Sequence, residues 1–278
     1  MHPQLSELTT QLAQRLLRGE HLTLCGPRGS GKSTVLAQVQ ARLGAAAVPC
    51  AYSISTVTLD DITQALEHAY PGVDTLEVGR RTARFRLWTA ADRRAGVLLL
   101  DHFQCNGSAM VSFLRRLHGK IAGVLTAVDV DNEKERHRMR PWRYGAMSVR
   151  MPLATAPQLR RLLDQRCRVL RLPSFNEHVA HKLVEAARGR PGWIVKCTDL
   201  ARESRYWCEH GPLVSVMCID AEAAVRYEAL DMVRPISAAR VEEFKRGNGA
   251  GDSAPSDRAR LFSDINSHLR SVGRTHRG

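Results

Sequence analysis

The segment GPRGSGKST at residues 26–34 constrains the fold of this chain more than any other stretch. It matches the pattern G-x-x-x-x-G-K-[ST], in which successive backbone N–H groups curl around phosphate groups at the start of a helix. The strand candidate HLTLC precedes it and the helix candidate KSTVLAQVQARLG follows it, as such a loop requires. We therefore expect a nucleotide-binding loop formed by Gly26, Pro27, Arg28, Gly29, Ser30, Gly31, Lys32, Ser33 and Thr34.

Three side chains have expected roles in this nucleotide site. Lys32 is expected to reach the β- and γ-phosphates, and Ser33 to ligate Mg²⁺. The segment VLLLDHF at 97–103 reads as a buried strand that delivers Asp101 to the same site. Its carboxylate is expected to hold Mg²⁺ directly or through water. The sequence thus predicts ATP and Mg²⁺ as cofactors.

His102 stands where nucleotide-hydrolysing enzymes usually keep a catalytic glutamate after the metal-binding aspartate. A neutral imidazole can accept a proton, but nearby phosphates would raise its pKa from about 6.5. Imidazole is therefore a poorer base for the attacking water than a carboxylate. The pattern predicts a nucleotide binder with slow or conditional hydrolysis, and leaves open whether the protein is an enzyme.

The first half of the chain alternates strand and helix patterns, which indicates a parallel α/β sheet flanked by helices. Apolar spacing and β-rich runs predict helices at 5–19, 32–44, 59–70, 79–94 and 108–119, and strands at 21–25, 47–54, 97–101 and 121–130.

Beyond residue 152 the strand signals fade and helical spacing predominates. Helices are expected at 155–170, 174–189, 192–207 and 220–230, the second opening with Ser174 and Glu177 at capping-box spacing. GNGAGDSAP at 247–255 is a flexible linker by composition, and 257–272 suits one short helix. We expect an α/β nucleotide-binding domain at 1–152, a smaller helical lid at 153–232 and a basic tail at 233–278.

Charge and cysteine content limit the classes of partner and compartment. The chain has a formal charge of +13 and a pI near 10. This excess favours an anionic partner, most often nucleic acid and less often an acidic protein or a membrane surface. Seven scattered cysteines without a C-x-x-C pair suit reduced thiols, and no signal peptide or bilayer-length apolar run is visible. The expectation is a soluble, cytoplasmic protein without a membrane partner.

The order of these pieces resembles the AAA+ ATPases, and their origin-recognition and transposition-regulator branch in particular. The resemblance spans roughly residues 1–230: a helix before HLTLC, the phosphate loop, VLLLDHF, a fourth strand ending near Asp129, and a lid with ARGRPGWIVKCTDLA. Only the phosphate loop is specific by itself. Signal-transduction ATPases share the G-x-P element of the lid, so the branch stays open.

The resemblance implies roles for further residues. The polar residue that senses the γ-phosphate would be Asp129 or, as the alternative, Thr126. An arginine offered to a neighbouring subunit's nucleotide would be Arg138, Arg140 or Arg143, with Arg140 as the central choice; the alternative is a solvated basic loop. In the lid, Arg190 and Pro191 would lie near the nucleotide. Gly192 stands where a sensor arginine often follows the lid proline.

A basic segment precedes the third strand. Arginines 80, 81, 84, 86, 93 and 94 crowd 15 residues, and Arg84 shares a helical face with Arg80 and with Arg81. In DNA-binding AAA+ relatives, residues near this strand follow a duplex backbone. The resemblance therefore implies that Arg80, Arg81, Arg84 and Arg86 contact DNA phosphates without reading sequence. The alternative is a solubilising face.

Together these features favour an ATP-dependent, DNA-binding oligomer of the transposition-regulator kind. Such a ring or filament would recruit a transposase, recombinase or other effector, and slow hydrolysis would time its disassembly. Two alternatives remain: a signalling switch ATPase whose partner is a protein, and a helicase loader.

Overall fold

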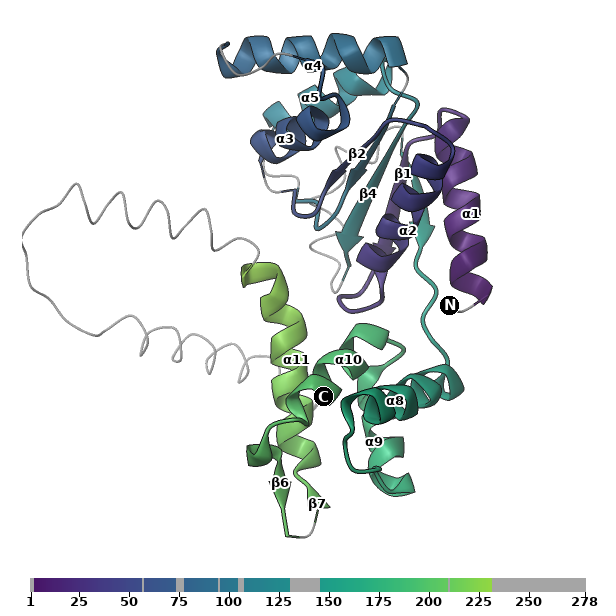
Figure 1. Cartoon of the computed structure of the whole chain (residues 1–278), viewed down its shortest axis with the longest axis vertical. Helices are drawn as coiled ribbons and strands as arrows, with labels where there is room; N and C mark the ends of the chain where they lie inside the picture. Colours follow the sequence, from purple (N-terminus) through teal and green to yellow (C-terminus); the bar gives the residue numbers. More distant parts are fainter. Residues whose placement is uncertain are drawn as a thin grey trace, which may run out of the picture. The chain divides into compact units, whose positions relative to one another are not determined.

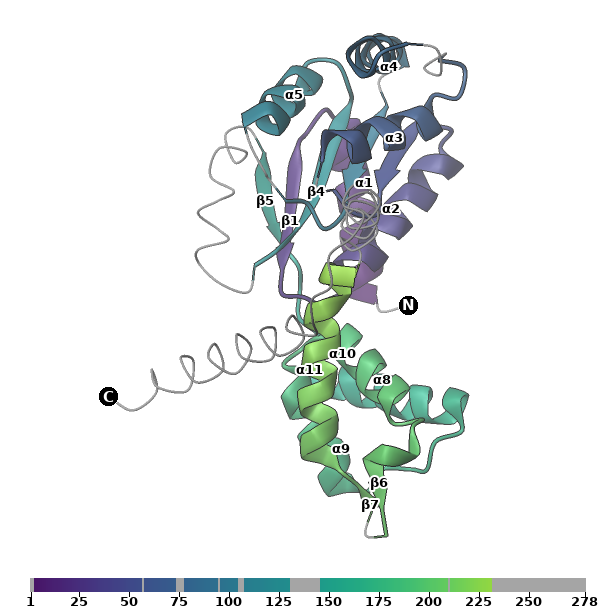
Figure 2. The ribbon, with the colours of Figure 1, turned by 90° about the vertical axis from the view of Figure 1, so that its left-hand side faces the viewer.

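The computed structural model describes residues 3–56, 58–73, 78–94, 96–104, 108–130, 146–209 and 211–231 (Figures 1 and 2). All of them belong to one compact unit, Met1–Val233. No helix within these described ranges is long and apolar enough to span a bilayer.

Five parallel strands form the sheet on which the phosphate loop is built. They are β1 (Leu22–Gly26), β2 (Cys50–Ser53), β3 (Val97–Leu100), β4 (Gly123–Asp129) and β5 (Met147–Arg150), in the order β2-β3-β4-β1-β5. Because every pair is parallel, the carboxyl ends of all five strands lie at one edge of the sheet. The register pairs Gly26 with Asp129, so the loop after β1 begins beside the end of β4.

Helices cover both faces of the sheet, as the alternating pattern predicts. Pro3–Leu17 (α1) and Lys32–Ala45 (α2) lie on one face, and Leu59–Ala69 (α3), Arg80–Arg94 (α4) and Ser108–His118 (α5) lie on the other (Figures 1 and 2). The buried strand β3 shows why. Val97 and Leu99 belong to the hydrophobic core formed with α1 and α2, whereas Leu98 and Leu100 belong to the core formed with α3, α4 and α5. A strand buried on both faces reads as a continuous apolar run. The predicted parallel sheet flanked by helices is confirmed.

The sequence does not predict the strand β5. Three residues of its segment MSVR are exposed and Val149 is partly buried, so the segment lacks the apolar pattern of a buried strand. Its backbone pairs with β1 over four positions, from Leu22–Met147 to Cys25–Arg150. Hydrogen bonding to a buried neighbour, rather than side-chain burial, therefore defines this edge strand.

The helical part, here called the lid, has its own hydrophobic core around Leu183, Trp193, Ile194 and Tyr206. Its elements are α8 (Ala156–Leu170), α9 (Glu177–Ala187), α10 (Pro191–Leu200), the short 3₁₀ helix η1 (Ser204–Tyr206), the hairpin β6 (Trp207–Cys208) and β7 (Gly211–Pro212), and α11 (Val214–Asp231).

Two sequence predictions for the lid are wrong. The helix expected at 192–207 ends at Leu200. Just beyond this end, the Trp207 indole N–H donates to the Ala201 carbonyl at 2.8 Å. The cap of α9 is Asn176 rather than Ser174: the Asn176 side chain accepts a hydrogen bond from the Val179 N–H at 2.9 Å. Both asparagine and serine make good caps, so the sequence alone could not choose between them.

Candidate nucleotide-binding site

The loop between β1 and α2 has the backbone that phosphate binding requires. Gly29 and Gly31 have φ values of 76° and 97°, in the left-handed region that glycine adopts without a steric penalty. Gly31 is the N-cap of α2, and no side chain caps this helix. The first N–H groups of a 14-residue helix therefore point out of its start, where the helix dipole favours an anion.

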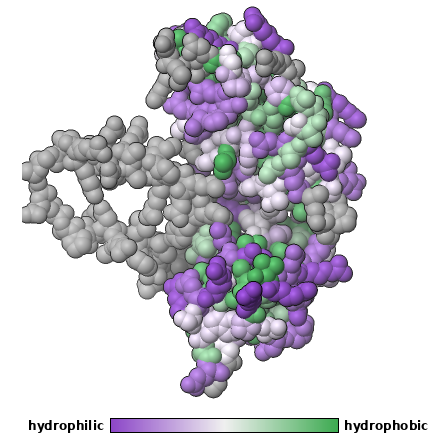
Figure 3. Space-filling view, in the orientation of Figure 1, coloured by the Kyte–Doolittle hydropathy of each residue, from purple (hydrophilic) through white to green (hydrophobic). Residues whose placement is uncertain are grey.

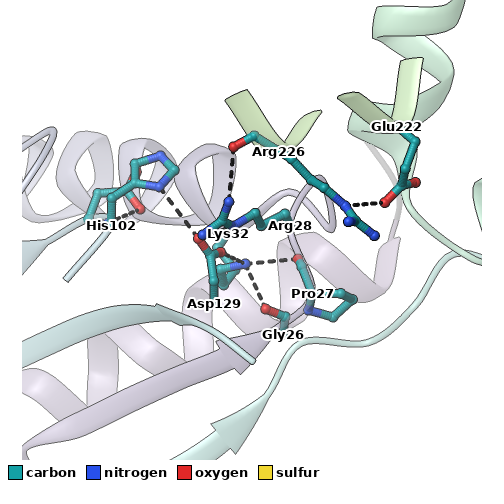
Figure 4. Close-up of polar contacts among 9 residues, drawn as sticks. Gly26, Pro27, Arg28, Lys32, His102, Asp129, Glu222 and Arg226 are labelled. Atoms are coloured by element: carbon teal, nitrogen blue, oxygen red, sulfur yellow. Dashed lines mark hydrogen bonds and ion pairs between the residues drawn. The ribbon is translucent and has the colours of Figure 1, made fainter. Parts of the chain in front are cut away.

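Lys32 is held at the centre of the site by three oxygens. Its Nζ donates to the carbonyls of Gly26 at 2.8 Å and Pro27 at 2.9 Å, and lies 2.8 Å from Asp129 Oδ1 (Figure 4). The side chain is only 6% exposed. Arg28 Nε lies 3.2 Å from the other oxygen of the same carboxylate. Two cations thus converge on Asp129 from the phosphate loop.

A third partner of Asp129 is His102, whose Nδ1 lies 3.8 Å from Oδ2. This distance is too long for a direct hydrogen bond, so the contact is electrostatic. Burial alone would raise the pKa of Asp129, but His102, Lys32 and Arg28 outweigh it and hold that pKa well below its usual range. The Asp129 carboxylate in turn raises the pKa of His102, more than partial burial lowers it.

Asp101 is 1% exposed and has a partner on each carboxylate oxygen. The backbone N–H of His102 donates to Oδ1 at 2.9 Å, and the Tyr52 hydroxyl donates to Oδ2 at 3.3 Å. Burial raises the pKa of Tyr52 and the neighbouring Asp101 raises it further, so the phenol keeps its proton and acts as a donor. Sequence reasoning missed Tyr52, although β2 pairs with β3 and carries it to the edge where Asp101 lies.

His102 has a backbone conformation unusual for its residue type. Its φ is 44°, in the left-handed region, which costs a non-glycine residue on the order of 1 kcal/mol. The turn brings its own N–H onto the Asp101 carboxylate. The strained backbone at 102 therefore helps to fix the orientation of Asp101.

The residues present fit a bound nucleoside triphosphate with its magnesium ion. Ser30 Oγ is buried and has no hydrogen-bond partner among the described residues, while the neighbouring cations already share one anion. Ser33 and Thr34 are exposed in the first turn of α2. When bound, the ion would neutralise charge on the phosphates, with Ser33 and Asp101 as its protein ligands.

The lid approaches the loop through Gly192. Its N–H donates to the Gly29 carbonyl at 2.8 Å, and a Cβ added at Gly192 would lie 2.9 Å from the Gly29 Cα. Pro191 is the first residue of α10. Arg190 is 12% exposed and pairs with Glu222 of α11 at 2.7 Å. The structure thus brings Pro191 close to the loop and places the Arg190 guanidinium within the lid.

A second contact joins the loop to α11. Arg28 Nη1 donates to the Arg226 carbonyl at 2.9 Å (Figure 4). The Arg226 side chain pairs with Glu222 at 3.1 Å, so Glu222 holds both Arg190 and Arg226. Burial would raise the pKa of Glu222, but these arginines outweigh it and keep that pKa below its usual value. Neither Glu222 nor Arg226 carried a signal in the sequence.

The other residues proposed from sequence lie away from this cluster or outside the described chain. Arg81 and Arg86 are exposed on α4, whereas Arg84 pairs with Asp60 at 2.7 Å. The side chain of Arg80 lies outside the described residues, as do Arg138, Arg140 and Arg143. Thr126 is fully buried in β4 and bonds the Thr23 hydroxyl, so Asp129 rather than Thr126 faces the loop.

No protein-family model matches the sequence. No curated protein matches it either. The crystal structure of Cdc6p from Pyrobaculum aerophilum matches in fold, with a TM-score of 0.51 and 18% identity over 73% of this chain and 61% of that chain. The Orc1 protein of Aeropyrum pernix, solved in complex with DNA, matches with a TM-score of 0.50 and 18% identity over 98% of this chain and 84% of that one. The chain has an AAA+ fold.

This likeness concerns the arrangement of the elements. The chain spans about three fifths of the length of the Pyrobaculum protein. In the AAA+ fold seen here, β4 lies between β1 and β3, so Asp129 stands between the phosphate loop and Asp101. The origin-recognition and transposition-regulator branch, and the roles of individual site residues, remain predictions.

Proposed function

We propose that this protein is a nucleotide-dependent AAA+ ATPase that acts on DNA. The observation that carries the proposal is the convergence of Lys32 and Arg28 on one carboxylate beside an uncapped helix start. Both cations, together with the free N–H groups of α2, suit the phosphates of ATP. Ser33 and Asp101 would hold Mg²⁺, and Asp129 would sense the terminal phosphate.

The proposed nucleic-acid contact lies on α4. Arg81 and Arg86 are exposed there, and the end of the molecule that carries α4 is coloured mainly as hydrophilic in Figure 3. The Aeropyrum Orc1 protein was solved in complex with DNA, which supports the same class of partner for this chain. Arginines on one helix would contact backbone phosphates without reading bases.

We further propose that ATP holds subunits together on DNA as a ring or filament. This assembly would recruit a transposase, recombinase or other effector, and slow hydrolysis would time its release. Arg140 would act on the neighbouring subunit's nucleotide. A helicase loader is a variant of this function, and a signalling switch with a protein partner is its rival.

Sedimentation of the purified protein tests the proposal. We expect large assemblies only when ATP and duplex DNA are both present, and small species with either one alone. Assembly with ATP but indifferent to DNA would favour the signalling switch. A protein that binds neither ATP nor DNA would contradict the proposal entirely.

The role of α4 in DNA binding needs a separate measurement. The double variant Arg81→Ala/Arg86→Ala should weaken DNA binding similarly across sequences. The salt slope should shrink by about 0.9 for each DNA phosphate that the variant no longer neutralises. The matched control is Arg161→Ala/Arg202→Ala, which removes the same charge from exposed positions of the lid. Equal effects of the two variants would show that net charge, and not α4, governs binding.

A further inference from the structure

The loop itself excludes an arginine at the position where the lid of related ATPases often carries one. Gly192 packs directly on Gly29, and an added Cβ would lie 2.9 Å from the Gly29 Cα and 3.0 Å from its carbonyl oxygen. Both neighbours are backbone atoms, which cannot rotate away. Any side chain at 192 would therefore push the loop and the lid apart and break the Gly192–Gly29 hydrogen bond.

The nearest lid arginine in sequence is also committed elsewhere. Arg190 donates to both carboxylate oxygens of Glu222, at 3.3 and 2.7 Å, and its Nε donates to the Ala187 carbonyl at 3.0 Å. Its side chain is only 12% exposed. Moving this guanidinium to the nucleotide would leave the Glu222 carboxylate paired, among the residues that the structure describes, with the exposed Arg226 alone. Arg190 is therefore better suited to holding the lid together.

Arg28 of the phosphate loop can offer a guanidinium to the nucleotide, which lid positions 190 and 192 cannot. Its Nε lies 3.2 Å from Asp129 Oδ2, and the other oxygen of that carboxylate lies 2.8 Å from Lys32 Nζ. An anion within reach of Lys32 is thus within reach of Arg28 as well. At the same time Arg28 Nη1 donates to the Arg226 carbonyl of α11 at 2.9 Å. The planar guanidinium can serve two partners at once because it carries five donors in a fixed fork.

We infer that Arg28 takes the place of the missing lid arginine, and that it couples the terminal phosphate of the nucleotide to helix α11. This inference rests on the proposed nucleotide-binding function. With a triphosphate bound, the Arg28 Nε–H donates to the phosphate instead of Asp129, while Nη1 still donates to the Arg226 carbonyl of α11. With a diphosphate, Arg28 stays on Asp129. The residue thereby distinguishes the two nucleotides and reports the difference to the lid.

Binding of a non-hydrolysable ATP analogue and of ADP, measured by calorimetry with magnesium, tests this role. Arg28→Ala should weaken binding of the analogue about tenfold, as expected when one charge-assisted hydrogen bond is removed, and ADP binding much less. Arg28→Lys retains the charge but not the fork, so it should recover part of the preference for the analogue. The matched control is Arg226→Ala, which removes the guanidinium that pairs with Glu222 but leaves the carbonyl that Arg28 binds.

Hydrogen exchange of the α11 backbone supplies the second readout. In the wild type the analogue should slow exchange near residues 222–226 more than ADP does. Arg28→Ala and Arg28→Lys should both abolish that difference, because neither side chain can bridge the phosphate and the Arg226 carbonyl. The control Arg226→Ala should keep it.

Two results would overturn the inference. One is an unchanged ratio of analogue to ADP affinity in Arg28→Ala, provided that the variant shows the wild-type circular dichroism spectrum. The other is loss of the ratio in Arg226→Ala as well, which would assign the effect to the lid surface. Failure of the proposed function looks different: Lys32→Ala would then bind nucleotide as well as the wild type does.

Discussion

Asp129 is the residue on which the charges of this site converge. One of its carboxylate oxygens pairs with Lys32, and the other lies near Arg28 and His102. A carboxylate that holds two loop cations occupies the electrostatic position that suits a phosphate group. Asp129 thus keeps both cations ordered. On the proposal made above, Lys32 exchanges this carboxylate for phosphate when nucleotide binds, and Arg28 does so only when a triphosphate is bound.

Lys32→Ala should abolish nucleotide binding while leaving the fold intact. The substitution removes the ammonium that the loop carbonyls and Asp129 hold at the centre of the site. We expect affinity for ATP to fall at least about a hundredfold, measured by calorimetry with magnesium. Lys182→Ala, on the exposed face of α9, serves as the control and should bind ATP like the wild type.

His102→Glu should accelerate ATP hydrolysis on the order of tenfold, a change of roughly 1.4 kcal/mol in the barrier. A carboxylate at this position can orient and deprotonate water at neutral pH, whereas the imidazole is drawn toward the Asp129 carboxylate. Steady-state phosphate release with saturating ATP measures the change. Rapid ATP hydrolysis by the wild type would show that another residue acts as the base, and Asp129 would be the first candidate.

His102→Gln separates chemistry from conformation in that experiment. Glutamine has the length of glutamate but cannot act as a base, and it meets the same left-handed backbone at residue 102. Equal acceleration by both variants would mean that the limit is conformational. Asp101→Ala should abolish magnesium-dependent hydrolysis in either case.

The sequence predicted Lys32 from the spacing of the phosphate loop and Asp101 from the end of a buried strand. It predicted Asp129 only through the resemblance to AAA+ ATPases, with Thr126 as the alternative. Tyr52 and Glu222 lacked such a pattern. Tyr52 reaches Asp101 only because β2 lies beside β3 in the sheet, and strand order is not visible in a single sequence. Glu222 bridges Arg190 and Arg226 through helix packing across 32 residues.

At the scale of elements, the cap of α9 gives a sharp comparison. Asn176→Ala should destabilise the lid by about 1 kcal/mol, because the Val179 N–H loses its acceptor. Ser174→Ala should change the free energy of unfolding by less than about 0.5 kcal/mol, since Ser174 is exposed and does not cap α9. Urea denaturation of the two variants measures the difference. Equal losses of stability in the two variants would indicate that Ser174 also caps the helix, as the sequence predicts.

The junction of α5 and β1 should make the protein sensitive to acid. His118, the last residue of α5, stacks on His21 with 3.7 Å between the ring centroids. Burial, and to a smaller extent the neighbouring His21, lowers the pKa of His118 to about 4. Between pH 6.5 and 4 the unfolded chain binds more protons than the folded one, so stability falls as the pH falls through this window.

Urea midpoints at about pH 7.5 and pH 5 measure that effect in the wild type and in His118→Gln. The loss of stability on acidification should be smaller in the variant by about 1 kcal/mol, once solvent screening of the half-buried ring is allowed for. His102 has a raised pKa and acts in the opposite direction, but it is present in both proteins and cancels in the comparison. An identical loss in both would exclude the histidine pair as its cause.

Prediction of elements from sequence succeeded where burial imposes a pattern. The strand β3 and the helix α8 have apolar residues at the spacing that their burial requires. The strand β5 and the hairpin β6–β7 are held by backbone pairing and by contacts such as that of Trp207 with Ala201. Pairing of this kind leaves little trace in the side chains.

At the scale of the whole molecule, the folded unit should be independent of the basic tail. The hydrophobic cores described above all lie within Met1–Val233. Residues 234–278 contain nine of the 41 Lys and Arg and five of the 28 Asp and Glu, so most of the positive excess precedes them.

The free energy of unfolding of a chain ending at Val233 should therefore lie within about 0.5 kcal/mol of that of the full chain. This shorter chain should also bind ATP and DNA with affinities similar to those of the full chain. Calorimetry and DNA binding at two salt concentrations measure this for the two chains. Loss of DNA binding on truncation, with ATP binding intact, would assign DNA binding to the tail, where arginines recur between Arg258 and Arg277.

The meeting of Gly29 and Gly192 affects how this protein can diversify. Loop and lid touch there through main-chain atoms, with a hydrogen bond between the two backbones. Substitution cannot strengthen such a pivot, and any side chain at either residue damages it. If nucleotide is coupled to the lid as proposed above, substitution can alter that coupling through residues around this contact, such as Arg28 and Glu222. Natural variants of this protein should accordingly keep glycine at both positions and differ at the residues around them.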